Sequence, residues 1–238
     1  MTDTTPQRTA DAIDRDEPVR VSQAMEDYLK IAYRLEEEGG PVTTQRLAEA
    51  LGFSGPSVTN MVKRLHELKL LEHNRYHGVT LTPAGKHVAL EVIRHHRLLE
   101  LYLAEALGFD WDEVHAEAER LEHHISEEFE QRMERVLGYP KFDPHGDPIP
   151  SRSGLLEDID DVALPDVPTG ASGQVSRVSD REPDYLRYLA GLGVKPGVQL
   201  VVKEHMPFDG PIRVEVDGIE QLLSLTVARA VRWSAGAE

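Results

Sequence analysis

The chain has 238 residues, a hydrophobic fraction of 40%, no cysteine and a formal net charge of −16. This length allows one large domain or two to three small ones. Without cysteine there are no disulfides, no thiolate ligands and no cysteine nucleophile. The acidic balance argues against non-specific nucleic-acid binding by the whole molecule, but it leaves room for a local basic surface.

Residues 1–21 are polar, with Asp and Arg interleaved, and are predicted to form a flexible N-terminal tail. This stretch has no apolar core, so it is neither a signal peptide nor a membrane span. No run of about 18 apolar residues, the length that a membrane helix needs, occurs elsewhere. We therefore expect a cytoplasmic protein with no membrane partner.

Residues 22–86 have the pattern of a winged helix-turn-helix domain. After a first helix, a short helix ends at Gly52, and Ser54 is placed to cap a second helix with Pro56 in its first turn. Two short helices joined by a glycine-containing turn fit a helix-turn-helix. The alternating runs 70–73 and 79–82 then predict a β-hairpin, the wing.

The winged segment is basic, unlike the rest of the chain. Between Pro41 and Lys86 six Lys or Arg stand against three acidic residues, which gives a net charge of +3. Short polar side chains followed by a cation suit the major groove of DNA. The candidate DNA-contacting residues are Thr44, Ser54, Pro56, Ser57, Thr59, Asn60, Lys63, Arg64, Arg75 and Tyr76. The alternative is a small α+β interaction module with no nucleic-acid role.

A long helix is predicted from Pro83 to Leu107, in a helical domain of residues 87–155. His96 and Glu100 lie four residues apart on its apolar side, where titratable groups need partners. His95 is expected to point away into solvent. Long apolar helix faces suit a dimer interface, and two-fold DNA readers usually dimerise.

A second amphipathic helix is predicted from Asp110 to Leu137, with Asp110 and Glu113 as its capping box. At about 100° per residue, four side chains beside its apolar stripe fall within roughly a quarter turn. They are His115, Glu119, Glu122 and His123. Two imidazoles and two carboxylates on a half-buried edge suit a divalent-metal site. The alternative is an ordinary solvated helix face. The carboxylate of Asp27, near the start of the first helix, can be explained without a metal, because the helix dipole favours negative charge there.

The C-terminal third changes character. Residues 156–173, rich in Pro and Gly with an acidic run, are predicted to form a linker. Residues 174–238 contain short β-like runs separated by turns and are predicted to form a small barrel-like β domain. The expected runs are 175–178, 198–203, 212–216 and 224–233, with a helix at 185–192. The expected fold class is therefore mainly α with a small β domain.

Six segments together resemble the diphtheria-toxin-repressor family of metal-dependent transcriptional repressors, including its manganese-responsive branch and its three-domain type. The segments are Glu26–Leu29, Ser54–Val58, His96–Glu100, Val114–Glu117, Glu119–His123 and Asp143–Pro150. The resemblance implies a winged-helix DNA-binding domain, a helical dimerisation and metal-binding domain and an SH3-like β barrel. It further implies a homodimer on double-stranded operator DNA that represses metal-uptake genes.

The resemblance also implies two metal sites. Residues matching the first site are Asp27, Glu119, Glu122 and His123, and residues matching the second are His96, Glu100 and His115. The SH3-like domain completes the second site in some members, and Asp180 or Glu182 would do so here.

The chemical types of the expected ligands indicate which metal activates the protein. Iron-responsive members of the family carry Met and Cys at the positions of Asp27 and Glu119, and hard oxygen ligands suit manganese better than soft sulfur does. We therefore expect Mn(II) as the activating metal and Fe(II) as the second candidate. Zn(II), Co(II) or Cd(II) are expected to substitute in vitro, because affinity alone does not enforce the choice.

Lys30 departs from the family pattern. Manganese regulators that lack the third domain carry an acidic residue there, one helical turn after the first acidic ligand. The lysine disfavours a closely spaced dinuclear manganese site and favours two separated sites.

An enzyme and a regulator of another kind are the alternative function classes. Ferritin-like di-metal oxidases carry Glu-x-x-His on two helices, and neither Glu119–His123 nor His96–Glu100 has that spacing. No nucleophile constellation or phosphate-binding glycine loop is present either, so we expect neither an enzyme nor a small organic substrate. A winged-helix regulator that senses a small organic ligand, its His and Glu groups merely solvated, stays open.

Overall fold

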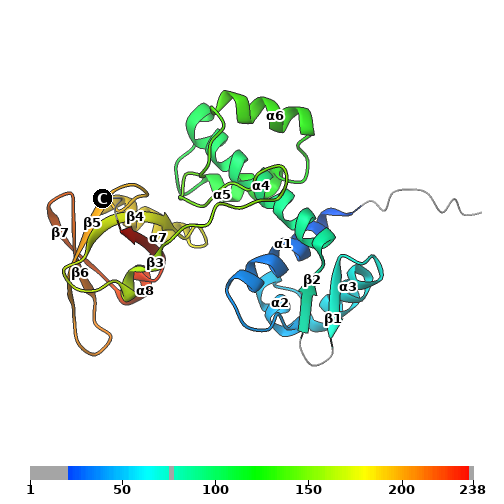
Figure 1. The fold of residues 1–238 in the computed structure, drawn as a ribbon, viewed down its shortest axis with the longest axis horizontal. Coiled ribbons are helices and arrows are strands. Elements are labelled where there is room, and N and C mark those ends of the chain that lie inside the picture. Colours follow the sequence, from blue (N-terminus) through cyan, green and yellow to red (C-terminus); the bar gives the residue numbers. More distant parts are fainter. Residues whose placement is uncertain (1–20, 75–77, 236–238) are drawn as a thin grey trace, which may run out of the picture.

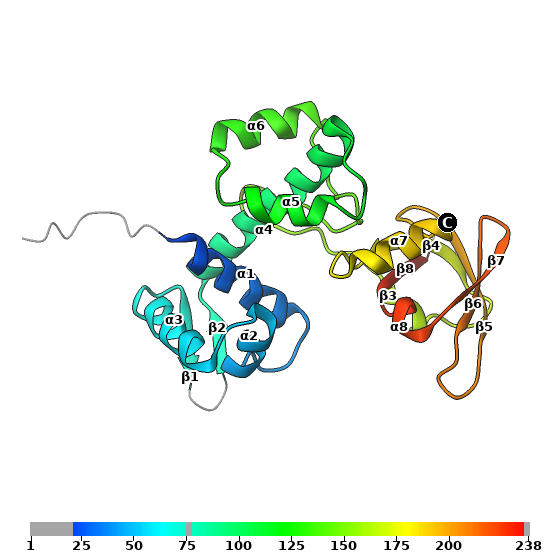
Figure 2. The same cartoon turned by 180° about the vertical axis from the view of Figure 1, so that it is seen from behind.

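The computed structural model describes residues 21–74 and 78–235, which form three lobes in chain order (Figure 1). Residues 1–20 of the predicted tail and the wing residues Arg75 and Tyr76 lie outside the described residues. A long helix leads from the first lobe into the second, and the β-rich third lobe lies to one side, as the reverse view also shows (Figure 2). Within the described ranges, no helix has both the length and the apolar character needed to cross a membrane.

The first lobe is a winged helix-turn-helix, as the sequence predicted. The Thr43 hydroxyl accepts the backbone N–H of Arg46 and starts α2, and Gly52 ends that helix in the left-handed conformation. In α3 the apolar positions Val58, Val62 and Leu65 are fully buried, so the opposite face stays in solvent. The elements are α1 (Gln23–Glu37), α2 (Thr44–Leu51), α3 (Gly55–Glu67), β1 (Leu71–Asn74) and β2 (Gly78–Leu81).

The second lobe is helical. Its elements are α4 (Pro83–Leu107), α5 (Val114–Leu121) and α6 (Glu127–Val136). The bounds of α4 are those predicted, because Thr82 caps its start with Pro83 in the first turn and Gly108 ends it at φ 72°. This helix packs against α1 at one end and against α5 at the other. It therefore connects the first lobe to the second.

The prediction of one helix from Asp110 to Leu137 was wrong in two respects. The chain turns after α5, and the Ser126 hydroxyl accepts the backbone N–H of Phe129 to start α6 as a separate helix. The Asp110–Glu113 capping box does not form, since α5 begins at Val114 and Glu113 makes no capping hydrogen bond with its side chain. The apolar spacing continues across the break, so periodicity alone did not reveal it. Glu122 and His123 consequently lie in the turn after α5.

The third lobe is the predicted SH3-like β domain. Its six-stranded sheet has the order β3-β8-β4-β5-β6-β7, and all neighbouring strands are antiparallel. The strands are β3 (Val162–Ala163), β4 (Ser172–Val178), β5 (Gln199–His205), β6 (Ile212–Val216), β7 (Ile219–Leu223) and β8 (Val231–Ala235). The helices are η1 (Leu164–Asp166), α7 (Pro183–Gly191) and α8 (Leu225–Ala228).

Two boundaries in the third lobe differ from the prediction. The expected linker 156–173 contains β3 and η1, and Leu164 is fully buried in the core of the β domain. The expected strand 224–233 is instead α8 followed by β8, because Ser224 caps a short helix through the N–H of Val227.

Strand β7 was not predicted from the sequence. The dipeptide Asp217-Gly218, which is typical of hairpin turns, precedes it, and both residues have positive φ.

A close backbone contact joins the second and third lobes. Gly146, at φ 89°, lies so near β4 that a Cβ atom there would be 2.1 Å from the carbonyl oxygen of Ser176. The N–H of Val178 donates to the carbonyl of His145 at 2.9 Å, and Arg177 pairs with Asp147 at 3.1 Å. These contacts hold the end of β4 against the helical lobe.

Candidate metal centre

The first donor group connects α1 with the turn after α5. The Nε2 atom of His123 lies 2.8 Å from Asp27 Oδ1 and 3.3 Å from Glu122 Oε1. The other ring nitrogen of His123 lies 2.6 Å from Glu26 Oε2. Glu122 is fully buried, whereas the Asp27 side chain is 42% exposed. Three of the four residues expected for the first site thus come together, although Asp27 and His123 are far apart in the sequence.

Glu119, the fourth expected member, lies in a neighbouring group with His96 and Glu122. The Lys30 side chain lies between Glu119 and Glu122 and contacts both. Its buried ammonium lies 2.8 Å from Glu119 Oε1 and 2.5 Å from Glu122 Oε1. The structure therefore places a fixed positive charge beside the first donor group.

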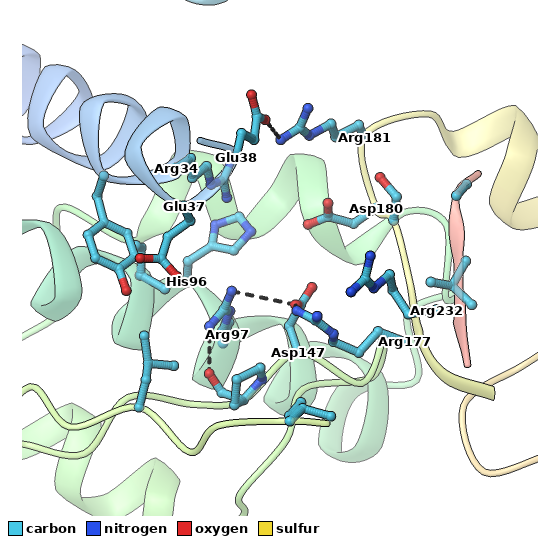
Figure 3. A pocket seen from close by; sticks show the side chains of 18 of the residues that line it. Arg34, Glu37, Glu38, His96, Arg97, Asp147, Arg177, Asp180, Arg181 and Arg232 are labelled. Atoms are coloured by element: carbon cyan, nitrogen blue, oxygen red, sulfur yellow. Dashed lines mark hydrogen bonds and ion pairs between the residues drawn. The ribbon is translucent and has the colours of Figure 1, made fainter. Parts of the chain in front are cut away.

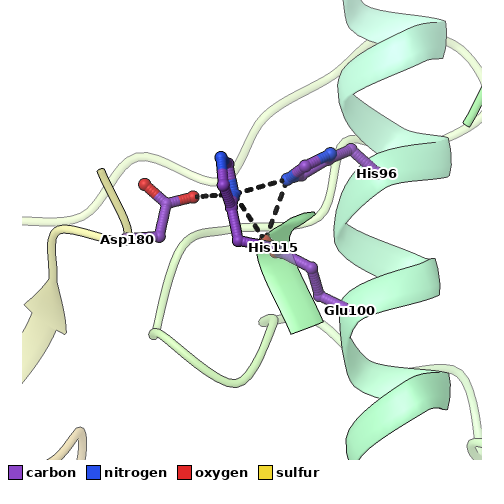
Figure 4. Close-up of side chains that lie close together, drawn as sticks. All are labelled: His96, Glu100, His115 and Asp180. Carbon is purple, nitrogen blue, oxygen red and sulfur yellow. Dashed lines mark hydrogen bonds and ion pairs between the residues drawn. The ribbon is translucent and has the colours of Figure 1, made fainter. Parts of the chain in front are cut away.

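The second donor group joins α4, α5 and the third lobe (Figure 4). Glu100 Oε1 lies 2.9 Å from His96 Nε2 and 3.0 Å from His115 Nδ1. His115 Nδ1 is also 3.0 Å from Asp180 Oδ2, just beyond β4. Of the two alternatives from the third lobe, the structure brings Asp180 to this group, whereas Glu182 is exposed at the start of α7.

Two residues beside this group were not selected from the sequence. Asp143 and His145 form a further buried group with Glu100. Sequence periodicity could not place them, because they lie in an irregular segment after α6. The only signal was the Asp143–Pro150 segment, which contributed to the resemblance without a role of its own.

The atoms of Glu100 and His145 that face each other have no hydrogen-bond partner in the described part of the chain. They are Glu100 Oε2 and His145 Nδ1, both buried and 3.8 Å apart. The other ring nitrogen of His145 donates to the carbonyl of Trp111 at 3.0 Å, which in a neutral ring leaves Nδ1 as a lone pair. Two buried acceptors facing each other require a proton or a cation between them. This pair therefore fits a divalent cation.

The histidines of this cluster are held in the charged form by the carboxylates. Burial lowers the pKa of His115, but Asp180 and Glu100 outweigh it and raise that pKa to about 10. The pKa of His145 is raised to about 9, because Glu100 and Asp143 outweigh burial. Burial opposes ionisation of Glu100, yet His96, His115 and His145 hold its pKa well below the ordinary range. A metal ion binding here would take the place of protons.

The expectation that His95 points into solvent was wrong. Its Nδ1 lies 3.2 Å from the carbonyl oxygen of Glu122, and its Nε2 lies 3.3 Å from Glu130. Both partners lie beyond α5, and the break before α6 brings them to α4. His95 therefore supports the turn that carries Glu122 and His123.

A cleft of about 790 Å³ lies between all three lobes (Figure 3). His96 and Asp180 line it, so the second donor group opens onto it. Arg181 of the third lobe pairs across it with Glu38, which follows α1. The lining is largely charged and includes Arg34, Arg97, Arg177, Glu37 and Asp147. Small organic ligands bind mostly in apolar pockets, so this cleft does not favour a regulator of that kind.

The candidate DNA-contacting residues that the structure describes are mostly exposed. Ser54, Pro56, Ser57, Asn60, Lys63 and Arg64 are exposed, and Thr44 and Thr59 are half-buried. The Thr59 hydroxyl donates to the carbonyl of Gly55 at 2.9 Å. Apart from Thr44, the first residue of α2, they belong to α3 or its cap.

Three known domain families match consecutive parts of the chain. The N-terminal DNA-binding domain of iron-dependent repressors matches residues 20–79, and their metal-binding and dimerisation domain matches residues 82–151. The FeoA domain matches residues 162–234. The iron-dependent repressor IdeR of Mycobacterium tuberculosis is 35% identical over 223 residues, covering 87% of this chain and 95% of that protein.

The chain belongs to the diphtheria-toxin-repressor family. The diphtheria toxin repressor of Corynebacterium diphtheriae is 32% identical over 217 residues, covering 87% of this chain and 95% of that protein. The chain is thus a member of a family of metal-dependent transcriptional repressors with DNA-binding and metal-binding domains. These relatives are repressors rather than enzymes, in agreement with the expectation from the sequence.

Solved structures of the diphtheria-toxin-repressor family share the whole architecture. A manganese-dependent transcriptional repressor in complex with manganese superposes with a TM-score of 0.84 at 38% identity, covering 89% of this chain and 99% of that one. ScaR with bound Cd²⁺ superposes with a TM-score of 0.78 at 33% identity, with the same coverage. The manganese-responsive branch is therefore supported, and both manganese and iron fit the family.

Proposed function

We propose that the protein is a repressor that Mn(II) activates for binding operator DNA as a homodimer in the cytoplasm. The observation that carries this proposal is the first donor group. It takes one carboxylate from α1 of the DNA-binding lobe and its other donors from the helical lobe. A divalent ion shared by both lobes would fix the position of one relative to the other.

The chemistry of the donors favours manganese. Asp27, Glu122 and His123 offer oxygen and imidazole nitrogen, and the chain has no cysteine. Oxygen-rich sites suit Mn(II), and Fe(II) is the second candidate. Zn(II), Co(II) and Cd(II) are expected to bind in vitro, because affinity for divalent metals follows the stability order more than the biological role.

The second site in this proposal is formed by His96, Glu100, His115 and Asp180. Each pair of neighbouring donor atoms in this group lies within hydrogen-bond distance, as expected for groups that share a cation or a proton. Asp143 and His145 extend the site on the other side of Glu100. Glu182 is left out of the ligand set because it is exposed at the N-cap of α7. An ion here would attach the third lobe through Asp180.

In the proposed mechanism the carboxylates of α1 and of the turn are the responsive element. Lys30 balances the charge of Glu122 in the metal-free protein, but Asp27 keeps an uncompensated charge, and a bound divalent ion would supply the positive charge that attracts Asp27 to the turn. With α1 fixed, α3 is held at a constant position relative to the dimer axis. The two recognition helices of a dimer can then lie about one helical turn of DNA, roughly 34 Å, apart.

The proposed DNA interface uses the exposed side of α3. Ser57, Thr59 and Asn60 reach base edges, and Lys63 and Arg64 reach phosphates, in this proposal. Apparent affinity for DNA falls with the fraction of molecules that hold both recognition helices correctly. Metal-free protein should therefore bind DNA weakly even though each helix is folded.

The proposal is tested by titrating metal-free protein with Mn(II) and following the free ion by EPR. Wild type should remove free Mn(II), and Asp27→Ala should bind fewer ions and lose Mn(II)-dependent binding to a DNA fragment selected from a random pool. Glu105→Ala, at an exposed position of α4, is the control and should behave as wild type.

No uptake of Mn(II) by wild type would contradict the manganese assignment, and an anaerobic Fe(II) titration would then test the second candidate. Full metal-dependent DNA binding by Asp27→Ala would remove α1 from the proposed mechanism.

A further inference from the structure

Lys30 is an unusual residue at its position in the fold. It lies on α1, one turn after Asp27, and its side chain is 2% exposed. A buried ammonium is stable only when oppositely charged or hydrogen-bonding groups surround it. In this protein two carboxylates surround the ammonium. Lys30 Nζ lies 2.8 Å from Glu119 Oε1 and 2.5 Å from Glu122 Oε1.

The ammonium lies in a place that otherwise has the character of a metal site. His96, Glu119 and Glu122 each offer a ligand atom, and these atoms lie within 4.8 Å of one another. Both oxygens of Glu122 are engaged, since Oε1 contacts Lys30 and Oε2 lies 2.6 Å from His96 Nδ1. The positive charge of the group comes from Lys30 on the opposite helix.

We propose that the Lys30 ammonium takes the place of a metal ion in the donor group of His96, Glu119 and Glu122. This inference rests on the proposed function, because it assigns the adjoining Asp27–Glu122–His123 group to a metal. Asp27, Glu119 and Glu122 together carry three negative charges. One divalent ion and one ammonium balance these three charges, and Glu26 faces the other ring nitrogen of His123, so the group of Glu119 and Glu122 needs no second ion.

The arrangement has a further consequence for the metal-free protein. Lys30 belongs to α1, whereas Glu119 and Glu122 belong to α5 and the turn after it. The ammonium therefore holds α1 near α5 before any metal binds. It also contacts Glu122, whose other oxygen contacts His96 of the second donor group. Glu122 thus connects the proposed sites through hydrogen bonds rather than through a pair of bridged ions.

The test replaces Lys30 by uncharged residues that leave room for an ion. Lys30→Gln and Lys30→Ala are purified in Mn(II), freed of unbound ion, and their bound Mn(II) is counted per protomer beside wild type. Both variants should hold one more ion than wild type, and their EPR spectra should show the broadening of two nearby Mn(II) ions. Lys30→Arg keeps the positive charge and should hold the same number as wild type.

The inference is overturned if the folded Gln and Ala variants hold the same number of ions as wild type, or if Lys30→Arg gains one. It is also overturned if neither uncharged variant folds in excess Mn(II), because the ion then cannot replace the ammonium. Wild type without bound Mn(II) would instead contradict the proposed function itself. The two failures are therefore distinguishable.

Discussion

At the scale of single residues, Glu100 has the most demanding environment. It is fully buried on α4, with one oxygen facing His96 and His115 and the other facing His145. Burial of a carboxylate is costly unless cations or hydrogen-bond donors surround it. In the metal-free protein the protonated histidines play that part, and their raised pKa values are the consequence.

These raised values predict how the stability of metal-free protein depends on pH. The pKa of His115 rises from 6.5 to about 10 and that of His145 from 6.5 to about 9. Both histidines hold protons more tightly when folded, so their stabilising effect is complete below pH 6.5 and disappears as pH rises through about 9 to 10. The melting temperature of metal-free protein, followed by circular dichroism, should fall over this range.

The control for this prediction is His87, an exposed histidine of α4. His115→Gln should reduce the fall in melting temperature, whereas His87→Gln, at an exposed position, should keep it. An equal fall in wild type and His115→Gln would show that His115 is not responsible. Affinity for Mn(II) should change in the opposite direction, rising with pH as the ligands lose protons.

At the scale of elements, the contact between the 143–147 segment and β4 decides where Asp180 lies. Gly146 allows the two backbones to meet, and β4 ends two residues before Asp180. Any side chain at residue 146 would meet the carbonyl oxygen of Ser176. The second donor group therefore depends on a position that provides no ligand.

Gly146→Ala should separate β4 from the helical lobe and remove Asp180 from His115. We expect the variant to bind one Mn(II) ion fewer per protomer than wild type while keeping the ion that depends on Asp27, measured by EPR of free Mn(II). Gly170→Ala is a matched control, because Gly170 has nearly the same φ, 87°, and its Cβ would meet nothing within 4 Å.

The choice between Asp180 and Glu182 can be settled in the same titration. Asp180→Ala should lose the same ion as Gly146→Ala, and Glu182→Ala should lose none. If Glu182→Ala lost the ion and Asp180→Ala kept it, Glu182 and not Asp180 would be the ligand.

At the scale of the whole molecule, charge is distributed unevenly. The chain has a net charge of −16, and the six Lys or Arg between Pro41 and Lys86 exceed the three acids of that segment by three. DNA affinity contributed by phosphate contacts falls with salt in proportion to the number of contacts. The acidic lobes repel DNA, so binding should be confined to the winged lobe.

Lys63→Ala should weaken DNA binding and lower its salt dependence. Loss of one phosphate contact changes the slope of log affinity against log salt by about 0.9. Lys141→Ala, an exposed residue after α6, should leave the slope unchanged. A wild-type slope in Lys63→Ala would exclude Lys63 from the phosphate contacts.

The sequence by itself determined the elements whose signals are local. Thr43, Gly52, Thr82 and Gly108 mark helix ends through their own backbone and side-chain chemistry, and α4 has the bounds that were predicted. The apolar spacing of α3 predicted which of its side chains are buried, namely Val58, Val62 and Leu65. The same local patterns drew attention to the histidines and carboxylates of α4, α5 and the turn after α5, whereas Asp27 was selected through the family resemblance.

Only the tertiary structure decided how these residues meet. Periodicity continues through residues 122–126, so the break before α6 depends on packing and on the cap at Ser126. The place of Lys30 between two carboxylates, and of Asp143 and His145 beside Glu100, depends on contacts between elements distant in sequence. Asp180 rather than Glu182 meets His115 because Gly146 lets β4 approach. Such contacts have no period in the sequence, since they arise when whole lobes pack together.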